Sequence, residues 1–492
     1  MARARRWFPV AISLAVVLAA VLLIAVAPDP ARSLPAPTGA QAANDPRLRG
    51  AYRFEQGGWI YVHLEGAPAQ LGFQHGYLLA REIEDAFKAV RLDSTHRTKR
   101  DWNFFRATAH NVLWPHIDAE YQEELRGIIE GVKARGVAMD LDDLVALNAF
   151  EEVPDYYVPW LNKKEKVANA PRLVSPGNCS AFVATGSYTR DGRIVMAHNN
   201  WTSYWAGQRW RIIFDLVPAR GYRILMDGFP GVIASDDDFG VNSSGIMITE
   251  TTITQFNGFD PNGKPEFVRA RKALQYADSI DAYVRIMLDG NNGGYANDWL
   301  LGDRKTGEVA QFELGLKNYK LWRTKDGYFV GSNFPSDPKL QKEETDFDPK
   351  NAISSPNARR ARWEQLMKEN KGKIDAAAAE RFMADHYDVI LKKEQPTERT
   401  LCGHADVAPR GIPEWEWGAF HPGGAVQGKV TDSKMAEAMS LRAHLGHPCG
   451  EDFLAKPFLS KHGEYAWQAP MLGDMKAGPW TLFQTNQKPP KQ

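Results

Sequence analysis

One cysteine stands at a position that suits acyl chemistry. Cys179 follows a polar stretch rich in helix-breaking residues and opens the strand-like run Ser180-Ala181-Phe182. If the bond between Asn178 and Cys179 is cut, Cys179 carries both a thiol and a free α-amine. The amine has a reference pKa of about 7.7–8.0 and the thiol one of about 8.5, so the amine can accept the thiol proton without a separate histidine. The pattern indicates an N-terminal thiol nucleophile, although a cysteine before a strand is more often a small buried apolar residue.

The periodicity of apolar residues changes at this cysteine. Before Gly177, a strand at 58–63 precedes helical stretches that run to 92, over 102–135 and over 140–150. After Cys179, a hairpin turns at Asp191-Gly192. Further elements follow, namely strands over 210–216, 222–226 and 245–252, a helix over 267–288, a β-meander over 299–331, helices over 357–369 and 376–386, and an irregular tail. Two groups of strands separated by helices predict a layered α+β fold.

The N-terminus is expected to lie outside the folded body. Three arginines precede an uncharged apolar run from Trp7 to Ala27, which predicts a signal peptide or membrane anchor over 1–27 and a Pro/Ala-rich linker over 28–44. The body would then be exported: periplasmic, secreted or anchored to the outer face of the cytoplasmic membrane. Lysine plus arginine balances aspartate plus glutamate at 60 each, so no nucleic-acid partner is expected. The oligomeric state is left open.

The cysteine count adds a second expectation. An exported chain with three cysteines suggests one disulfide and one free thiol, and Cys402 and Cys449 are the natural pair because both lie in the C-terminal region. Cys179 would remain free. The acidic run Asp236 to Asp238 lacks the loop pattern of a calcium site, so neither a metal nor another cofactor is expected.

Five short motifs follow one another from Cys179 onward, and their order resembles the phospholipase B-like family. They are Cys179-Ser180-Ala181, His198-Asn199-Asn200-Trp201, Asp237-Asp238-Phe239 with Gly245 and Glu250-Thr251-Thr252, Asn297-Asp298-Trp299, and Asn333-Phe334-Pro335. That family belongs to the N-terminal-nucleophile hydrolases, with acid ceramidase, bile-salt hydrolases and penicillin-type acyltransferases. The resemblance implies a four-layer αββα sandwich, autocatalytic cleavage between Asn178 and Cys179, and hydrolysis of an acyl ester or amide.

The same resemblance assigns roles to individual residues. It implies that Cys179 is the nucleophile, that His198 lines the site, and that Thr252 or its neighbour Thr251 positions the nucleophile. Asn333 would donate to the oxyanion, because its amide can donate a hydrogen bond without ionising. An asparagine before a proline-containing turn is also often structural. The residues that would bind the substrate are Trp201, Asp238 and Asn297.

The domain organisation follows from the cleavage site. Residues 45–178 would form a helical, propeptide-like part that stays associated, and residues 179–492 the catalytic αββα domain. The expected substrate is a lipid or small-molecule acyl compound. An N-acyl amide hydrolase, an acyltransferase and a non-catalytic envelope binding protein remain open alternatives. A papain-like protease is disfavoured because it would need its cysteine at the start of a helix.

Overall fold

Two β-sheets face each other across a buried apolar layer in the computed structural model, which describes residues 45–173, 179–237 and 239–489. Within these ranges the first sheet contains, in spatial order, β1 (Tyr52–Gln56), β2 (Trp59–Gly66), β5 (Ile212–Pro218), β6 (Ile224–Gly228), β7 (Gly240–Asn242), β8 (Ile246–Thr252), β9 (Asn297–Asp303), β10 (Glu308–Leu314) and β11 (Tyr319–Thr324). The second contains β12 (Gly327–Gly331), β3 (Ser180–Gly186), β4 (Gly192–Ser203), β15 (Gly423–Asp432), β16 (Ser440–Leu445) and β17 (Thr481–Gln484). The predicted α+β class is confirmed.

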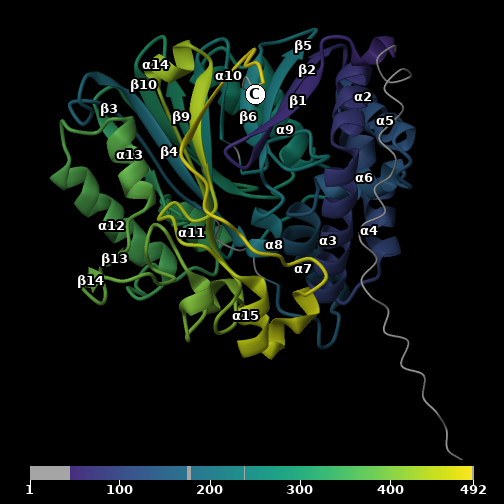
Figure 1. Ribbon diagram of the computed structural model, residues 1–492. Helices are drawn as coiled ribbons and strands as arrows, with labels where there is room; N and C mark the ends of the chain where they lie inside the picture. The colour runs from purple at the N-terminus through teal and green to yellow at the C-terminus, as the bar shows by residue number, and fades with distance from the viewer. Residues whose placement is uncertain (1–44, 174–178, 238, 490–492) are drawn as a thin grey trace, which may run out of the picture. The chain divides into compact units, whose positions relative to one another are not determined.

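Alternate side chains of each strand build separate layers of the core. On β2, Trp59 and Tyr61 pack between the sheets, whereas Ile60 and Val62 pack against helices. On β3, Ala181 and Val183 face the first sheet, whereas Phe182 and Ala184 face the helices on the outer side of the second sheet. This period of two is what a strand buried on both faces requires. Helices therefore cover the outer face of each sheet (Figure 1).

The helices divide between the two outer faces. Those that pack on the first sheet are α2 (Pro68–Leu78), α3 (Ala80–Thr98), α4 (Trp102–Thr108), α5 (Ala119–Ala134), α6 (Leu141–Asn148), α7 (Val158–Glu165), α9 (Glu266–Tyr276) and α10 (Ile280–Leu288). The second sheet is covered by α12 (Ser355–Glu369) and α13 (Ala376–Met383). Four shorter helices are α8 (Tyr204–Gly207), α11 (Pro338–Glu344), α14 (Ser433–Glu437) and α15 (Ala455–Lys461).

Glycines allow α2 and α5 to approach closely. A Cβ atom at Gly72 would lie 1.9 Å from the carbonyl oxygen of Glu124, and one at Gly127 would lie 2.4 Å from that of Ala69. Larger residues at these positions would force the two helix backbones apart. The glycines on both helices thus determine how closely α2 and α5 pack in the helical N-terminal part.

The part of the chain before Cys179 also joins the first sheet. β1 and β2 form one edge of it, and β2 pairs in parallel with β5, with Ile60 opposite Ile212 and Leu64 opposite Leu216. The residues on both sides of Cys179 therefore share one hydrophobic core.

Three expectations from the sequence need correction. The predicted helix over 267–288 is two helices, because the Ser279 side chain accepts from the Ala282 amide and caps a new one. The predicted irregular tail contains β15, which lies between β4 and β16; its glycines and burial on both faces hide the alternation that marks a strand. The predicted disulfide is wrong: Cys402 and Cys449 are not bridged, and their sulfur atoms lie in a cluster with two imidazoles.

Several predictions fall outside the described residues. These are the N-terminal anchor and linker over 1–44, Asn178 at the cleavage site, and Asp238. In the ranges that the structure describes, no helix has the length and apolar character needed to cross a membrane.

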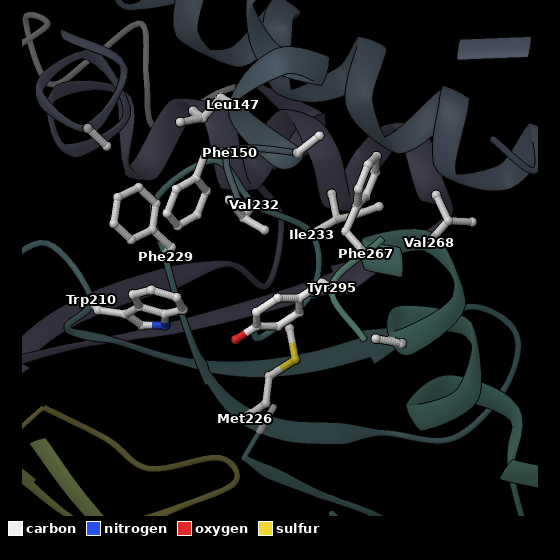
Figure 2. Packing of buried hydrophobic residues seen from close by; sticks show 14 of the residues in the cluster. Leu147, Phe150, Trp210, Met226, Phe229, Val232, Ile233, Phe267, Val268 and Tyr295 are labelled. Carbon is white, nitrogen blue, oxygen red and sulfur yellow. The ribbon is translucent and has the colours of Figure 1, made fainter. Parts of the chain in front are cut away.

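The largest apolar cluster lies between the first sheet and its helices (Figure 2). Its close-packed side chains include Phe150, Phe229 and Ile233. Fully buried at the edge of this cluster, His75 of α2 accepts a hydrogen bond at Nε2 from the Gly231 amide (3.0 Å). Burial, and secondarily the charge of Arg271, lowers the pKa of His75 to about 3. The neutral imidazole is therefore part of the folded structure.

Acid should destabilise the protein through this histidine. Its folded pKa lies below the unfolded value, so the unfolded chain takes up the proton first and stability is lost as the pH falls below about 6.5. From the shift of His75, the free energy of unfolding should drop by about 2–3 kcal/mol between about pH 7 and pH 4.5. Urea unfolding of wild type and His75→Gln, which keeps an acceptor but cannot titrate, measures this. An equal pH dependence in both proteins would contradict the assignment.

Candidate active site

Cys179 occupies a strained position at the start of the second sheet. It directly precedes β3, is completely buried, and has a φ angle of 90°, which is unusual for any residue but glycine. β3 then pairs with β4, so that Ser180 lies opposite Asn199 and Ala181 opposite His198. Backbone strain of this kind costs about 1–3 kcal/mol and is concentrated at functional sites.

The thiol lies in a cluster of polar side chains from both sheets. The Cys179 Sγ is 3.8 Å from Oε1 of Glu250 on β8, and a ring nitrogen of His198 completes a group whose atoms lie within 4.8 Å of one another. The Tyr295 hydroxyl, which reaches out of the apolar cluster in Figure 2, donates to Glu250 Oε1 (3.3 Å). With its amide nitrogen facing acceptors, Asn297 donates to Glu250 Oε2 (2.9 Å). Glu250 thus connects β8, β9 and the nucleophile.

Burial controls the protonation of this cluster. It raises the pKa of the Cys179 thiol well above its usual range, and the carboxylates of Glu250 and Asp237 add to the effect. A hydrogen bond from the Trp201 backbone and the charge of Lys429 act in the opposite direction. Burial also lowers the pKa of His198 to about 3, so its ring is neutral near pH 7. The intact chain therefore holds Cys179 as a thiol.

A buried guanidinium holds the residues around the nucleophile. Arg359 of α12 donates from Nη1 to the Cys179 carbonyl (2.5 Å) and to the Ser180 hydroxyl (3.0 Å). Its Nη2 donates to Asn333 Oδ1 (2.7 Å). The guanidinium also lies over the Trp201 ring, with Cζ 4.5 Å from the ring centroid. Burial lowers the pKa of Arg359 to about 9, so it remains a cation near neutral pH.

A second buried cation lies on the neighbouring strand β15. Lys429 Nζ donates to Asp227 Oδ2 (2.6 Å) and to Asp237 Oδ2. The Ser235 hydroxyl donates to both carboxylates. Lys429 also lies opposite His198 in the second sheet. The charges of this network therefore act on the thiol cluster.

The structure brings most of the predicted site residues together. Cys179 and His198 share the thiol cluster, Asn297 contacts Glu250, and Asn333 Nδ2 donates to the Thr252 carbonyl (2.8 Å). The hydroxyls of Thr251 and Thr252 are buried without a hydrogen-bond partner among the described residues. Their positioning role therefore stays a prediction, as does the oxyanion role of Asn333.

Other residues were missed from the sequence. Glu250 stood in a recognised motif without a role, and Tyr295 lies just before the Asn297 motif, so both were within reach of the sequence pattern. Arg359 carries no local signal, since a single arginine in an amphipathic helix normally faces solvent. Lys429 lies in β15, within the range where the sequence predicts an irregular tail.

A cavity of about 450 Å³ shares Trp415 with the surroundings of Arg359. Its lining includes Arg172 and Leu173, the last described residues before Cys179, and Thr202, which follows Trp201. Trp415 lines the cavity and also lies under Arg359, 5.6 Å from ring centroid to Cζ. The wall combines aromatic side chains, among them Phe150, Trp205, Trp417 and Trp467, with charged ones such as Arg97, Asp155 and Glu464. Trp201 itself packs in a small core with its Nε1 bonded to the Leu401 carbonyl (3.1 Å).

The cluster offers the groups that acyl transfer needs. It holds a sulfur atom that could act as a nucleophile and buried hydrogen-bond donors, and Trp415 under Arg359 also lines the cavity. The sulfur, nitrogen and oxygen of Cys179, His198 and Glu250 could also bind a divalent ion. Three side chains fall one short of the four protein ligands of a structural zinc site.

Comparison with known proteins finds similarity to one family. The phospholipase B family model matches residues 91–322. An uncharacterized protein of Archaeoglobus fulgidus is 26% identical over 50% of this chain and 42% of its own length. Phospholipase B-like protein F of Dictyostelium discoideum is 29% identical over 34% of this chain and 31% of its own. Phospholipase B-like 1 of Bos taurus is 25% identical over 48% of each.

The matched region contains Cys179, the thiol cluster and most of the first sheet. In each of these relatives, less than half of the length is covered by this chain. Over this region the chain is similar to the phospholipase B-like family, which is the family that the ordered motifs resemble.

Proposed function

We propose that this protein is an acyl hydrolase that uses Cys179 as an N-terminal nucleophile after cleaving its own chain before that residue. The observation that carries the proposal is the strained, buried Cys179, whose thiol faces Glu250 and whose carbonyl is held by Arg359. Similarity to the phospholipase B-like family supports the reaction class.

Self-cleavage begins in the intact chain. The Cys179 sulfur attacks the carbonyl carbon of Asn178, the C–N bond breaks, and the nitrogen takes a proton to become the α-amine of Cys179. The product is a thioester, which water hydrolyses to the Asn178 carboxylate and a free thiol. Glu250, 3.8 Å from the sulfur, is positioned to accept the thiol proton in the first step.

The new amine then changes the proton balance at the site. It replaces an amide by a base next to the thiol, which overcomes the effect of burial that keeps the thiol protonated before cleavage. In turnover the amine takes the thiol proton, sulfur attacks the substrate carbonyl, and the ammonium returns a proton to the leaving alcohol or amine. Water hydrolyses the second thioester. Asn333, held between Arg359 and the Thr252 carbonyl, is proposed to stabilise the oxyanion.

The cavity favours an apolar acyl group. The aromatic part of its wall suits a hydrocarbon chain, whereas charged side chains such as Arg97, Asp155 and Arg172 line the rest. Burial, with the neighbouring Asp155 carboxylate, raises the pKa of the lining residue Glu151 to about 8, which reduces its negative charge near pH 7. We propose a lipid-type acyl ester as substrate. Because self-cleavage is itself amide chemistry, an N-acyl amide is the second candidate, and acyl transfer to an amine would follow the same first steps.

Self-cleavage should divide the chain into two fragments that remain together. β1 and β2 lie in the same sheet as β5, so the fragments share a core and should co-purify. Denaturing electrophoresis should show two bands, and N-terminal sequencing of the longer fragment should begin Cys-Ser-Ala-Phe. Cys179→Ala should give one band and no hydrolysis of ester or amide substrates. The matched Cys179→Ser variant keeps the shape of the side chain and replaces only the thiol, so it tests whether the sulfur itself is required. An uncut wild-type chain with full activity would refute the mechanism.

Two further variants test the groups around the thiol. Asn333→Ala should lower the rate of hydrolysis by about 10²–10³-fold if its amide stabilises the oxyanion. Arg359→Lys keeps the charge but cannot donate to the Cys179 carbonyl, Ser180 and Asn333 together, so it should slow both self-cleavage and turnover. Kinetics on a chromogenic acyl ester, with circular dichroism as a folding check, measure both effects. Wild-type rates in both variants would exclude these roles.

A further inference from the structure

A second group of sulfur and nitrogen ligands lies apart from the thiol of Cys179. Of the described residues, His386, Cys402, His404 and Cys449 place one ligand atom each within 4.8 Å of the others. They come from the end of α13, from the loop before β15 and from the segment after β16. We propose that these four residues bind a structural zinc ion.

The distances in the cluster match a tetrahedral site. A zinc ion with bonds of about 2.3 Å to sulfur and about 2.0–2.1 Å to nitrogen keeps neighbouring ligand atoms roughly 3.3–3.8 Å apart. His404 Nε2 lies 3.2 Å from His386 Nε2, 3.8 Å from Cys402 Sγ and 3.7 Å from Cys449 Sγ. Two cysteines and two histidines are also a common ligand set of structural zinc sites.

Hydrogen bonding alone does not explain this convergence. The Nε2 atom of a neutral histidine carries either one hydrogen or one lone pair, yet His404 Nε2 faces three ligand atoms at once. A cation in the centre satisfies every member of the group. Cys402 and His404 are buried, and His386 and Cys449 are partly exposed, so an ion can enter from the surface.

The surroundings of His404 suit a metal ligand. Its other ring nitrogen, Nδ1, faces the Asp406 carboxylate at 3.9 Å, and that carboxylate accepts a hydrogen bond from the Tyr204 hydroxyl (2.6 Å). Carboxylates beyond a zinc-bound histidine are frequent and orient the ring. The His447 ring stacks on His404, with the centroids 4.1 Å apart.

The ion would fasten a loop to β4. The Leu401 carbonyl accepts from Asn199 Nδ2 (3.0 Å) and from Trp201 Nε1 (3.1 Å). The Gly403 carbonyl accepts from the Ala425 amide of β15 (2.9 Å). With four protein ligands the site is closed to substrate, so its contribution is to stability.

Metal analysis of the full chain tests this proposal. Protein purified without chelators should contain about one zinc per chain, and Cys402→Ser/Cys449→Ser should contain almost none. Cys179→Ala is the first control, because it removes the remaining thiol and should keep the zinc. His447→Asn is the second, since this ring touches the cluster without belonging to it. Zinc lost in Cys179→Ala but retained in the double variant would overturn the proposal, as would a Cys402–Cys449 disulfide found by peptide mass spectrometry.

Two measurements on the wild-type chain cover the case in which the double variant does not fold. Chelation should lower the melting temperature, and zinc should restore it. Cobalt(II) added to the metal-free chain should give the absorption bands of a tetrahedral ion with thiolate ligands, in Cys179→Ala as well. An octahedral cobalt spectrum, or a melting temperature that chelation does not change, would contradict a structural tetrahedral site.

Discussion

Arg359 carries its charge into the interior of the protein, where its guanidinium donates to the Cys179 carbonyl, the Ser180 hydroxyl and Asn333 Oδ1. Moving such a cation out of water costs several kcal/mol unless it is fully hydrogen-bonded. The planar guanidinium meets this need because its N–H groups reach all three acceptors. The faces of Trp201 and Trp415 add cation–π attraction. The position of α12 on the second sheet therefore decides where the nucleophile, Asn333 and the cavity wall lie relative to one another.

The placement of the first strands has an equally direct consequence. Because β2 pairs in parallel with β5, the chain before Cys179 and the chain after it complete the same sheet. The glycine contacts between α2 and α5 then fix the helices that cover it. A break in the chain before Cys179 would free an α-amine without removing either half of the core.

Buried charges surround the thiol on several sides. Lys429 neutralises part of the Asp227 and Asp237 charge, while Glu250 is held by Tyr295 and Asn297. In such an environment the protonation of each group depends on its neighbours more than on its own reference pKa. Loss of the Glu250, Asp237 or Lys429 charge would therefore change the pKa of the Cys179 thiol.

The sequence by itself determined the features that local pattern encodes. The change of period at Cys179 and the turn at Asp191-Gly192 predicted the α+β class and the hairpin β3–β4, and the ordered motifs predicted the similarity to the phospholipase B-like family. The resemblance also implied that Cys179, His198, Asn297 and Asn333 belong to one site.

Only the tertiary structure decided which distant residues complete the site. Arg359 and Lys429 reach the thiol cluster from a helix and a strand that no local period connects to Cys179. The same limit led to the wrong disulfide: counting cysteines pairs Cys402 with Cys449 but cannot show that two histidines lie between the same segments. The periodicity of apolar residues and the turn residues reflect interactions among a few neighbours in the chain. The packing of sheets and helices, in contrast, brings together residues far apart in the chain.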